Sequence, residues 1–192
     1  MKRAIYLLLM VSIIACLFAG CGETKGDLST FKGIPYGATQ KEVMPQVEAM
    51  LKKQGYDGEV EESIDYNKDN DYNEIKDIFR DVKVDDYKGD LQLKFITKED
   101  KNRTDSLFCG ATYLFRDITQ YKEEEIIEFY RKEFTKLYGE PQWDSTSSYD
   151  GSRVLRWNDE KNTVGCAIIS FRSLGSSSVH VSFYSNDIKN KL

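Results

Sequence analysis

Alternating apolar and polar residues dominate the last third of the chain. In Val179–Tyr184, the side chains at 179, 181 and 183 are apolar and share one side of an extended strand. Val164–Ile169 is apolar at nearly every position, which is typical of a central strand buried on both faces. Arg153–Trp157 is a third candidate strand, and turn-forming residues separate the three segments. This region therefore predicts antiparallel strands joined by short turns.

The middle of the chain repeats this alternating pattern. Leu91, Leu93 and Phe95 alternate with polar residues, and Leu107–Phe115 is a second extended segment. The polar stretch Lys98–Thr104 lies between them and reads as a hairpin loop. We therefore expect a second group of antiparallel strands here.

Helical periodicity precedes each group of strands. Thr39 followed by Glu42 forms a capping box, and the apolar residues after it recur at helical spacing: Val43, Val47, Met50 and Leu51. Pro45 lies past the first turn, so it predicts either a kink or a later helix start.

The second predicted helix covers Glu123–Tyr138 and ends at Gly139 and Pro141. Its apolar face carries four residues: Ile127, Tyr130, Phe134 and Leu137. Three glutamates lie at its start, where the positive end of the helix dipole stabilises negatively charged side chains.

The order of helix, strands, helix, strands predicts an α+β fold, in which an antiparallel meander sheet carries about two helices on one face. Thr39–Glu42 resembles Thr119–Glu123, which suggests two similar αβββ halves, 31–117 and 118–192. We expect both halves to belong to one globular domain, 31–192.

Composition narrows the class of protein. The chain has 192 residues, of which 40% are apolar and 31% charged, so a polytopic membrane protein and a disordered chain are excluded. The net charge is −5, and Lys2 and Arg3 are the only charges of residues 1–20, so residues 21–192 carry −7. An acidic domain of this kind argues against a nucleic-acid partner.

A targeting signal occupies the N-terminus. The cationic pair Lys2-Arg3 precedes an apolar run, Ala4–Gly20, as in a secretory signal peptide. The sequence Leu17-Phe18-Ala19-Gly20-Cys21 resembles the lipobox of bacterial lipoproteins, although Phe18 stands where an aliphatic residue is usual. The resemblance implies a signal peptide at 1–20, a lipidated Cys21 and a tether over 21–30. The domain is then anchored on the extracytoplasmic face of a bacterial membrane.

The alternative for the same segment is an uncleaved membrane anchor. Its 17 residues are at the short end for a spanning helix, which needs about 20. Either reading leaves the rest of the chain outside the cytoplasm.

Two segments of the domain resemble small exported bacterial domains built from helix-plus-meander units. Tyr36–Val43 and Leu137–Pro141, the latter followed by the strand at Trp157, look like the SmpA/OmlA and β-lactamase-inhibitor-like folds. The resemblance implies a fold of that kind and transfers no function and no binding residue.

Few residues of the domain carry chemistry. Cys109 and Cys166 are the candidates for a disulfide in an exported protein, and the alternative is two separate buried thiols. His180 alternates with valines, so it should point away from the core. It would serve an enzyme only if an acid such as Asp150 or Glu160 converged on it. No catalytic motif or cofactor-binding motif is present, so we expect no enzyme activity and no cofactor.

An acidic loop supplies the metal candidate. Asp65, Asn67 and Asp69 place oxygen ligands at alternate positions, as in the first half of a calcium loop. Lys76 stands where that loop needs a bidentate glutamate. A solvated loop without metal is therefore the favoured interpretation.

These observations favour a non-enzymatic lipoprotein that binds another envelope protein or supports an envelope assembly. The alternative is a surface receptor for a small ligand or a glycan. An open sheet face would favour the first, and a walled cavity lined by aromatic residues would favour the second.

Overall fold

The computed structural model describes residues 26–65, 72–98, 103–161, 163–173 and 176–192. In chain order, its helices and strands are β1 (Thr30–Phe31), β2 (Ile34–Pro35), α2 (Gln40–Lys53), β3 (Val60–Asp65), β4 (Asn73–Val84), β5 (Tyr87–Thr97), η1 (Arg103–Asp105), β6 (Leu107–Ile118), α3 (Gln120–Tyr138), β7 (Trp143–Thr146), β8 (Arg153–Asn158), β9 (Val164–Ser173), β10 (Ser176–Ser185) and η2 (Asp187–Lys191).

Eight of the strands form one antiparallel sheet in the order β3-β4-β5-β6-β10-β9-β8-β7, and β1 pairs with β2. The α+β prediction is confirmed. The order also divides the large sheet into two equivalent parts, each a helix followed by a four-stranded meander. The expected αβββ halves therefore each have one strand more than predicted, and β3, β4 and β7 are the strands of the large sheet without a sequence prediction. The last strands of the two halves, β6 and β10, pair with each other at the centre.

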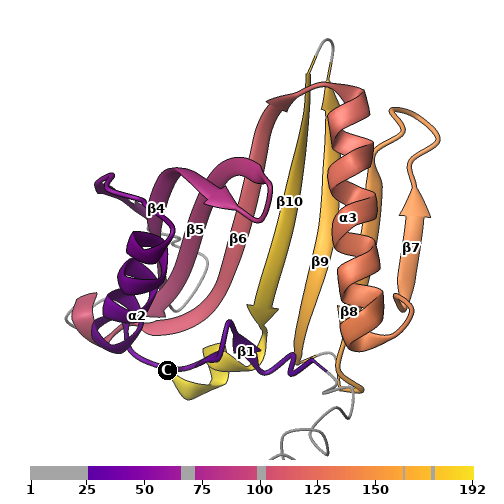
Figure 1. Cartoon of the computed structure of the whole chain (residues 1–192). Helices are drawn as coiled ribbons and strands as arrows, with labels where there is room; N and C mark the ends of the chain where they lie inside the picture. The colour runs from indigo at the N-terminus through magenta and orange to yellow at the C-terminus, as the bar shows by residue number, and fades with distance from the viewer. Residues whose placement is uncertain (1–25, 66–71, 99–102, 162, 174–175) are drawn as a thin grey trace, which may run out of the picture.

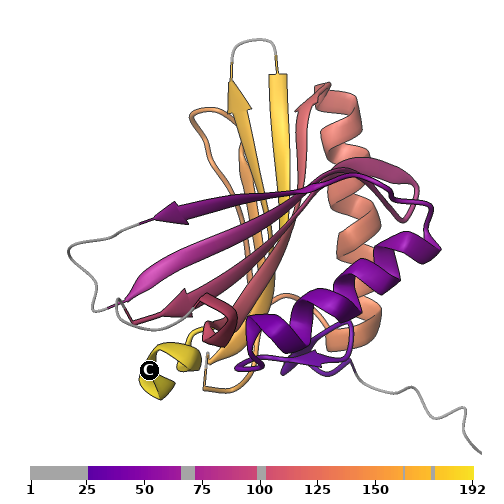
Figure 2. The same ribbon diagram turned by 90° about the vertical axis from the view of Figure 1, so that its left-hand side faces the viewer.

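Both helices lie on the same side of this sheet. In Figure 1, α2 stands in front of the first group of strands and α3 in front of the second. Figure 2 shows that β3–β5 run at a large angle to β9 and β10, so the sheet is strongly twisted. No helix or strand of the described chain covers the opposite side, which we call the open face.

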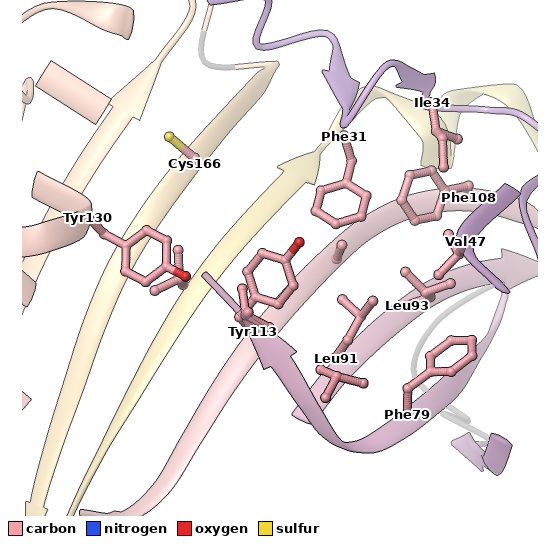
Figure 3. Packing of buried hydrophobic residues seen from close by; sticks show 14 of the residues in the cluster. Phe31, Ile34, Val47, Phe79, Leu91, Leu93, Phe108, Tyr113, Tyr130 and Cys166 are labelled. Atoms are coloured by element: carbon pink, nitrogen blue, oxygen red, sulfur yellow. The ribbon is translucent and has the colours of Figure 1, made fainter. Parts of the chain in front are cut away.

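The core fills the space between the helices and the sheet. Phe31, Val47, Phe79 and Leu91 are among the buried side chains gathered there (Figure 3). In the second half, Phe134 of α3 meets Trp157 of β8 edge to face, with 5.4 Å between ring centroids. The Trp157 indole N–H donates to the Gly139 carbonyl at 2.8 Å, which fixes the end of α3 against the sheet.

Helix α2 begins where its capping box predicts. The Glu42 carboxylate accepts from the Thr39 backbone N–H at 2.8 Å and from the Thr39 hydroxyl at 2.7 Å. The delayed start that Pro45 suggested is wrong, because the helix runs from Gln40 through Pro45 to Lys53. One missing N–H is tolerated since three apolar residues of the helix are buried on the sheet: Val43, Val47 and Leu51.

Helix α3 begins at Gln120, three residues earlier than predicted, and the Thr119 hydroxyl accepts from the Lys122 N–H at 3.2 Å. Its buried face includes Ile126, which the prediction missed, whereas the predicted Leu137 is 36% exposed. Glu123 is fully buried and pairs with Arg172 of β9, at 2.9 Å between oxygen and nitrogen. The residue that the sequence assigned to a helix dipole thus also joins α3 to the sheet.

Candidate functional site

Alternation along the strands assigns each side chain to the covered or the open face. Val179 and Val181 of β10 are fully buried on the side of α3, so the half-buried His180 between them points to the open face. Its cross-strand neighbours are Leu114 on β6 and Ile169 on β9, which therefore share that face. The prediction that His180 points away from the core is confirmed.

The open face of β6–β10 contains no carboxylate at its alternating positions. These positions are Gly110, Thr112, Leu114 and Arg116 of β6, Ser178, His180, Ser182 and Tyr184 of β10, Gly165, Ala167, Ile169 and Phe171 of β9, Val154, Arg156 and Asn158 of β8, and Trp143 and Ser145 of β7. We call this surface the acid-free face. Its charged side chains are the two arginines, and small residues line its centre.

A hollow of about 430 Å³ lies near one end of the acid-free face. Phe171 and His180 meet there edge to face, with 4.9 Å between ring centroids, and Phe171 is 51% exposed. Leu114 and Arg116 form part of the lining, and Asp117 is the carboxylate at its border. The hollow therefore combines an exposed aromatic ring, a cation and the serines of the β9–β10 hairpin.

Burial and the nearby Arg116 guanidinium lower the pKa of His180 below 6.5. Both causes disfavour the charged imidazolium, so this side chain is neutral at pH 7. At that pH, the positive charge of the hollow comes from Arg116 and from Arg172, and the latter is paired with Glu123. The closest described carboxylate to Arg116 is Asp90, at 3.7 Å.

A second cluster lies on the outer strands of the acid-free face. Arg156 is exposed on β8 and makes no ion pair with any described carboxylate. Its cross-strand neighbour on the edge strand β7 is Trp143, which is 59% exposed and donates its indole N–H to Ser145 at 2.9 Å. Tyr184 donates its hydroxyl to Asn158 at 2.5 Å, which ties its side chain to β8 beside this cluster. Arginine and large aromatic residues are the types that dominate protein interfaces.

The open side of β3–β5 has the opposite character, and we call it the charged face. Arg80 lies between Glu61 and Asp90, at 2.8 and 2.7 Å. Two lysines complete the pattern, since Lys76 pairs with Asp65 and Glu74, and Lys94 also pairs with Glu74. The charges of this surface are thus satisfied by their own neighbours.

The candidate disulfide is not formed, because Cys109 and Cys166 are separate buried thiols, which was the alternative interpretation. Cys109 lies on β6 and Cys166 on β9, and β10 runs between these strands. Two strand spacings separate them by about 9.5 Å, whereas a disulfide needs Cα atoms within about 7 Å. Burial also raises the pKa of the Cys166 thiol, so it stays protonated and unreactive.

The calcium candidate is only partly visible. Asp65 ends β3 and binds Lys76 at 2.8 Å, while Asn67 and Asp69 lie outside the described residues. The lysine that argued against calcium in the sequence therefore occupies the first candidate ligand. No group of metal-binding side chains occurs in the described parts of the chain.

The structure does not bring the two candidate acids to His180. Asp150 lies in the β7–β8 turn, where it accepts hydrogen bonds from the backbone and side chain of Ser152. Glu160 lies in the connection between β8 and β9, and neither acid lines the hollow at His180. Sequence reasoning also missed Phe171 and Arg156, whose positions opposite the buried side of each strand were the available signal.

Comparisons with models of known protein families, with curated proteins and with solved structures found no match. Cys21 and its lipobox lie outside the described residues. No helix within the described ranges is long and apolar enough to cross a membrane.

Proposed function

We propose that this chain is a lipoprotein, anchored through Cys21 on the extracytoplasmic face of a bacterial membrane, and that its acid-free face binds another envelope protein. The lipobox supports the anchor. Two or three acyl chains hold a protein stably on a bilayer, whereas one gives only reversible binding. In this proposal the domain has no catalytic role and needs no cofactor.

The chemistry of the acid-free face is the observation that carries the binding role. Phe171 and Trp143 are more than half exposed, and Arg156 has no carboxylate partner in the described chain. A partner with apolar and acidic side chains would bury the two rings and neutralise the arginine. Electrostatic complementarity of this kind selects the partner and speeds association.

The alternative is a small anionic ligand or glycan in the hollow at Phe171 and His180. Its volume falls within the range of ligand pockets, and its serines offer hydroxyl groups. A second hollow, of about 610 Å³ beside Tyr56, is lined mostly by polar and charged side chains such as Glu59, Arg80 and Lys83. Neither has the aromatic walls expected of a glycan site, which favours the protein partner.

Site-specific photo-crosslinking tests the binding face. A photoreactive amino acid at Phe171 or Ile169 should give one discrete crosslinked product in intact cells. The matched control is Tyr121, an aromatic residue on α3 that is 79% exposed and faces away from the sheet. Arg156→Glu should abolish the crosslink at Ile169, and Lys132→Glu, an exposed charge reversal on α3, should not. Equal products from both faces would contradict the proposal.

The anchor is tested separately. Cys21→Ser should leave the precursor unprocessed and remove the acyl mass from the protein. Membrane retention with unchanged mass in that variant would favour the uncleaved anchor instead.

A further inference from the structure

The described chain begins at a point where it is already attached to the fold. The Gly26 N–H donates to the Leu137 carbonyl at 2.9 Å, in the last turn of α3. Leu28 packs against the hydrophobic core, and β1 follows at Thr30. The second half of the expected tether, 21–30, is therefore part of the folded domain.

Only residues 22–25 then separate Cys21 from the docked Gly26. An extended chain advances at most about 3.6 Å per residue, so the two Cα atoms lie within about 18 Å of each other. This limit is shorter than α3 itself, whose 19 residues span about 28 Å. A lipid on Cys21 cannot reach past the domain, so the end that carries Gly26 stays next to the bilayer.

Different helices, strands and turns lie at the two ends of the molecule. The C-terminal end of α3, β1 and η2 lie together at the lower end in Figure 1, whereas the β7–β8 turn and the β9–β10 hairpin lie at the upper end. The register agrees, because Tyr184 pairs with Gly110 near the lower end and Ser177 pairs with Ile118 near the upper end. His180 lies five residues along β10 from Ser185, or about 17 Å above the lower end.

We propose that the end formed by β1, β2, η2 and the last turn of α3 rests on the lipid surface, so that the sheet stands upright on the membrane. The inference depends on the proposed lipidation of Cys21. The hollow at Phe171 and His180 is then held away from the headgroups, and a partner approaches the acid-free face along the membrane plane.

The short tether sets this orientation, because the charges at the lower end do not favour one type of lipid. Lys32 and Lys191 are exposed there, and so are Glu140 and Asp187. The orientation is therefore expected to be the same on zwitterionic and on anionic bilayers, and to survive high salt.

Fluorescence quenching from the membrane surface tests the proposal on the full lipidated chain in phosphatidylcholine vesicles. A fluorophore is attached through Glu140→Cys, just after α3, or through Tyr149→Cys, in the β7–β8 turn, where the native side chain is 98% exposed. The native Cys109 and Cys166 are buried and stay unlabelled. A nitroxide on the lipid headgroups should reduce the fluorescence at position 140 and leave that at position 149 unchanged.

An extended tether supplies the matched control. About twenty glycine and serine residues inserted after Glu23 add a flexible span of roughly 25 Å, which should remove the difference between the two positions. Equal quenching at both positions in the original chain overturns the orientation and leaves the anchor intact. Persistence of the difference with the long tether also overturns it. A protein that fails to float with the vesicles contradicts the lipidation itself.

Discussion

The two halves of the domain share one architecture and differ in how they complete the open side of the sheet. Residues 31–117 carry a network of paired charges there, centred on Arg80 and Lys76. Residues 118–192 present serines, exposed rings and Arg156, without a carboxylate at the alternating positions. Because the covered face alone must form a core, the open faces are free to diverge, and the surface that is not self-satisfied is the better candidate for a binding role.

The two halves can also be compared on the side of the sheet that the helices cover. There, each half buries one carboxylate beneath its helix. In the first half, Asp77 of β4 accepts from Gln40 at 2.5 Å and from Arg103 at 2.8 Å, and burial raises its pKa. In the second half, Glu123 comes from the helix and Arg172 from the strand. Both pairs fix the start of a helix to the sheet, with the roles of helix and strand exchanged.

The largest effect is expected at the pair in the second half. Glu123→Ala should lower the free energy of unfolding by about 3 kcal/mol, because it leaves Arg172 without its main partner between α3 and the sheet. Glu124 is the matched control, since it is exposed and contacts the same arginine at only 3.5 Å. Urea denaturation of both variants checks the difference. Similar losses of unfolding free energy in the two variants would mean that the burial of Glu123 does not contribute to stability.

On the acid-free face, Phe171→Ala should weaken partner binding by roughly tenfold or more, since truncation of a hot-spot residue near the centre of an interface costs about 2 kcal/mol or more. The free energy of unfolding should change by less than about 0.5 kcal/mol, because the ring is half exposed. Binding titrations and thermal melts of one preparation separate the two effects. A large loss of stability with intact binding would assign Phe171 to the fold instead.

The charged face predicts the reverse pattern. Arg80→Ala should cost about 1 kcal/mol of stability, because Asp90 is 13% exposed and loses its closest partner. The loss should shrink in high salt, and partner binding should be unaffected. Lys88→Ala removes a largely exposed ion pair with Asp81 and should not measurably change the free energy of unfolding. A binding defect in Arg80→Ala would mean that the interface extends from the acid-free face onto the charged face.

The smallest effect concerns pH at the hollow. The lowered pKa of His180 means that the unfolded chain binds this proton more readily than the folded one. The contribution is complete above pH 6.5 and is lost as the pH falls through the folded-state pKa. His180→Gln should therefore flatten the decline of the melting temperature below pH 6.5. His180 is the only histidine, so its NMR titration gives the folded pKa without ambiguity, and a value above 6.5 would contradict the environment described.

Regular alternation made the second half predictable from the sequence. The strands β8, β9 and β10 appear where the pattern of apolar residues indicated, and the predicted burial of β9 on both faces holds from Gly165 to Ile168. In the first half, β4 was not predicted, and the reason is physical. Its alternation shifts at a bulge between Phe79 and Val82, where Asp81 has a positive φ of 57°, and the buried Asp77 breaks the apolar side.

The candidate site was harder to predict from the sequence than the fold. His180 was found as an open-face residue because it is the single histidine and its neighbours alternate. Phe171 was missed because the predicted strand ended at Ile169, so the residue was not assigned to either face of the sheet. The exposed edge strand β7 was likewise missed, because four residues are too short to show a period.

The central pairing of β6 with β10 makes folding of the two halves interdependent. Each half alone would present its fourth strand as a long unpaired edge, with apolar side chains along one side. The edge of β6 in one molecule fits β10 of another as well as its own, which is the requirement for domain swapping. Under the proposed lipid anchoring, copies of the chain would share one plane at a high local concentration, so slow joining of the halves on the membrane would favour exchanged dimers over monomers.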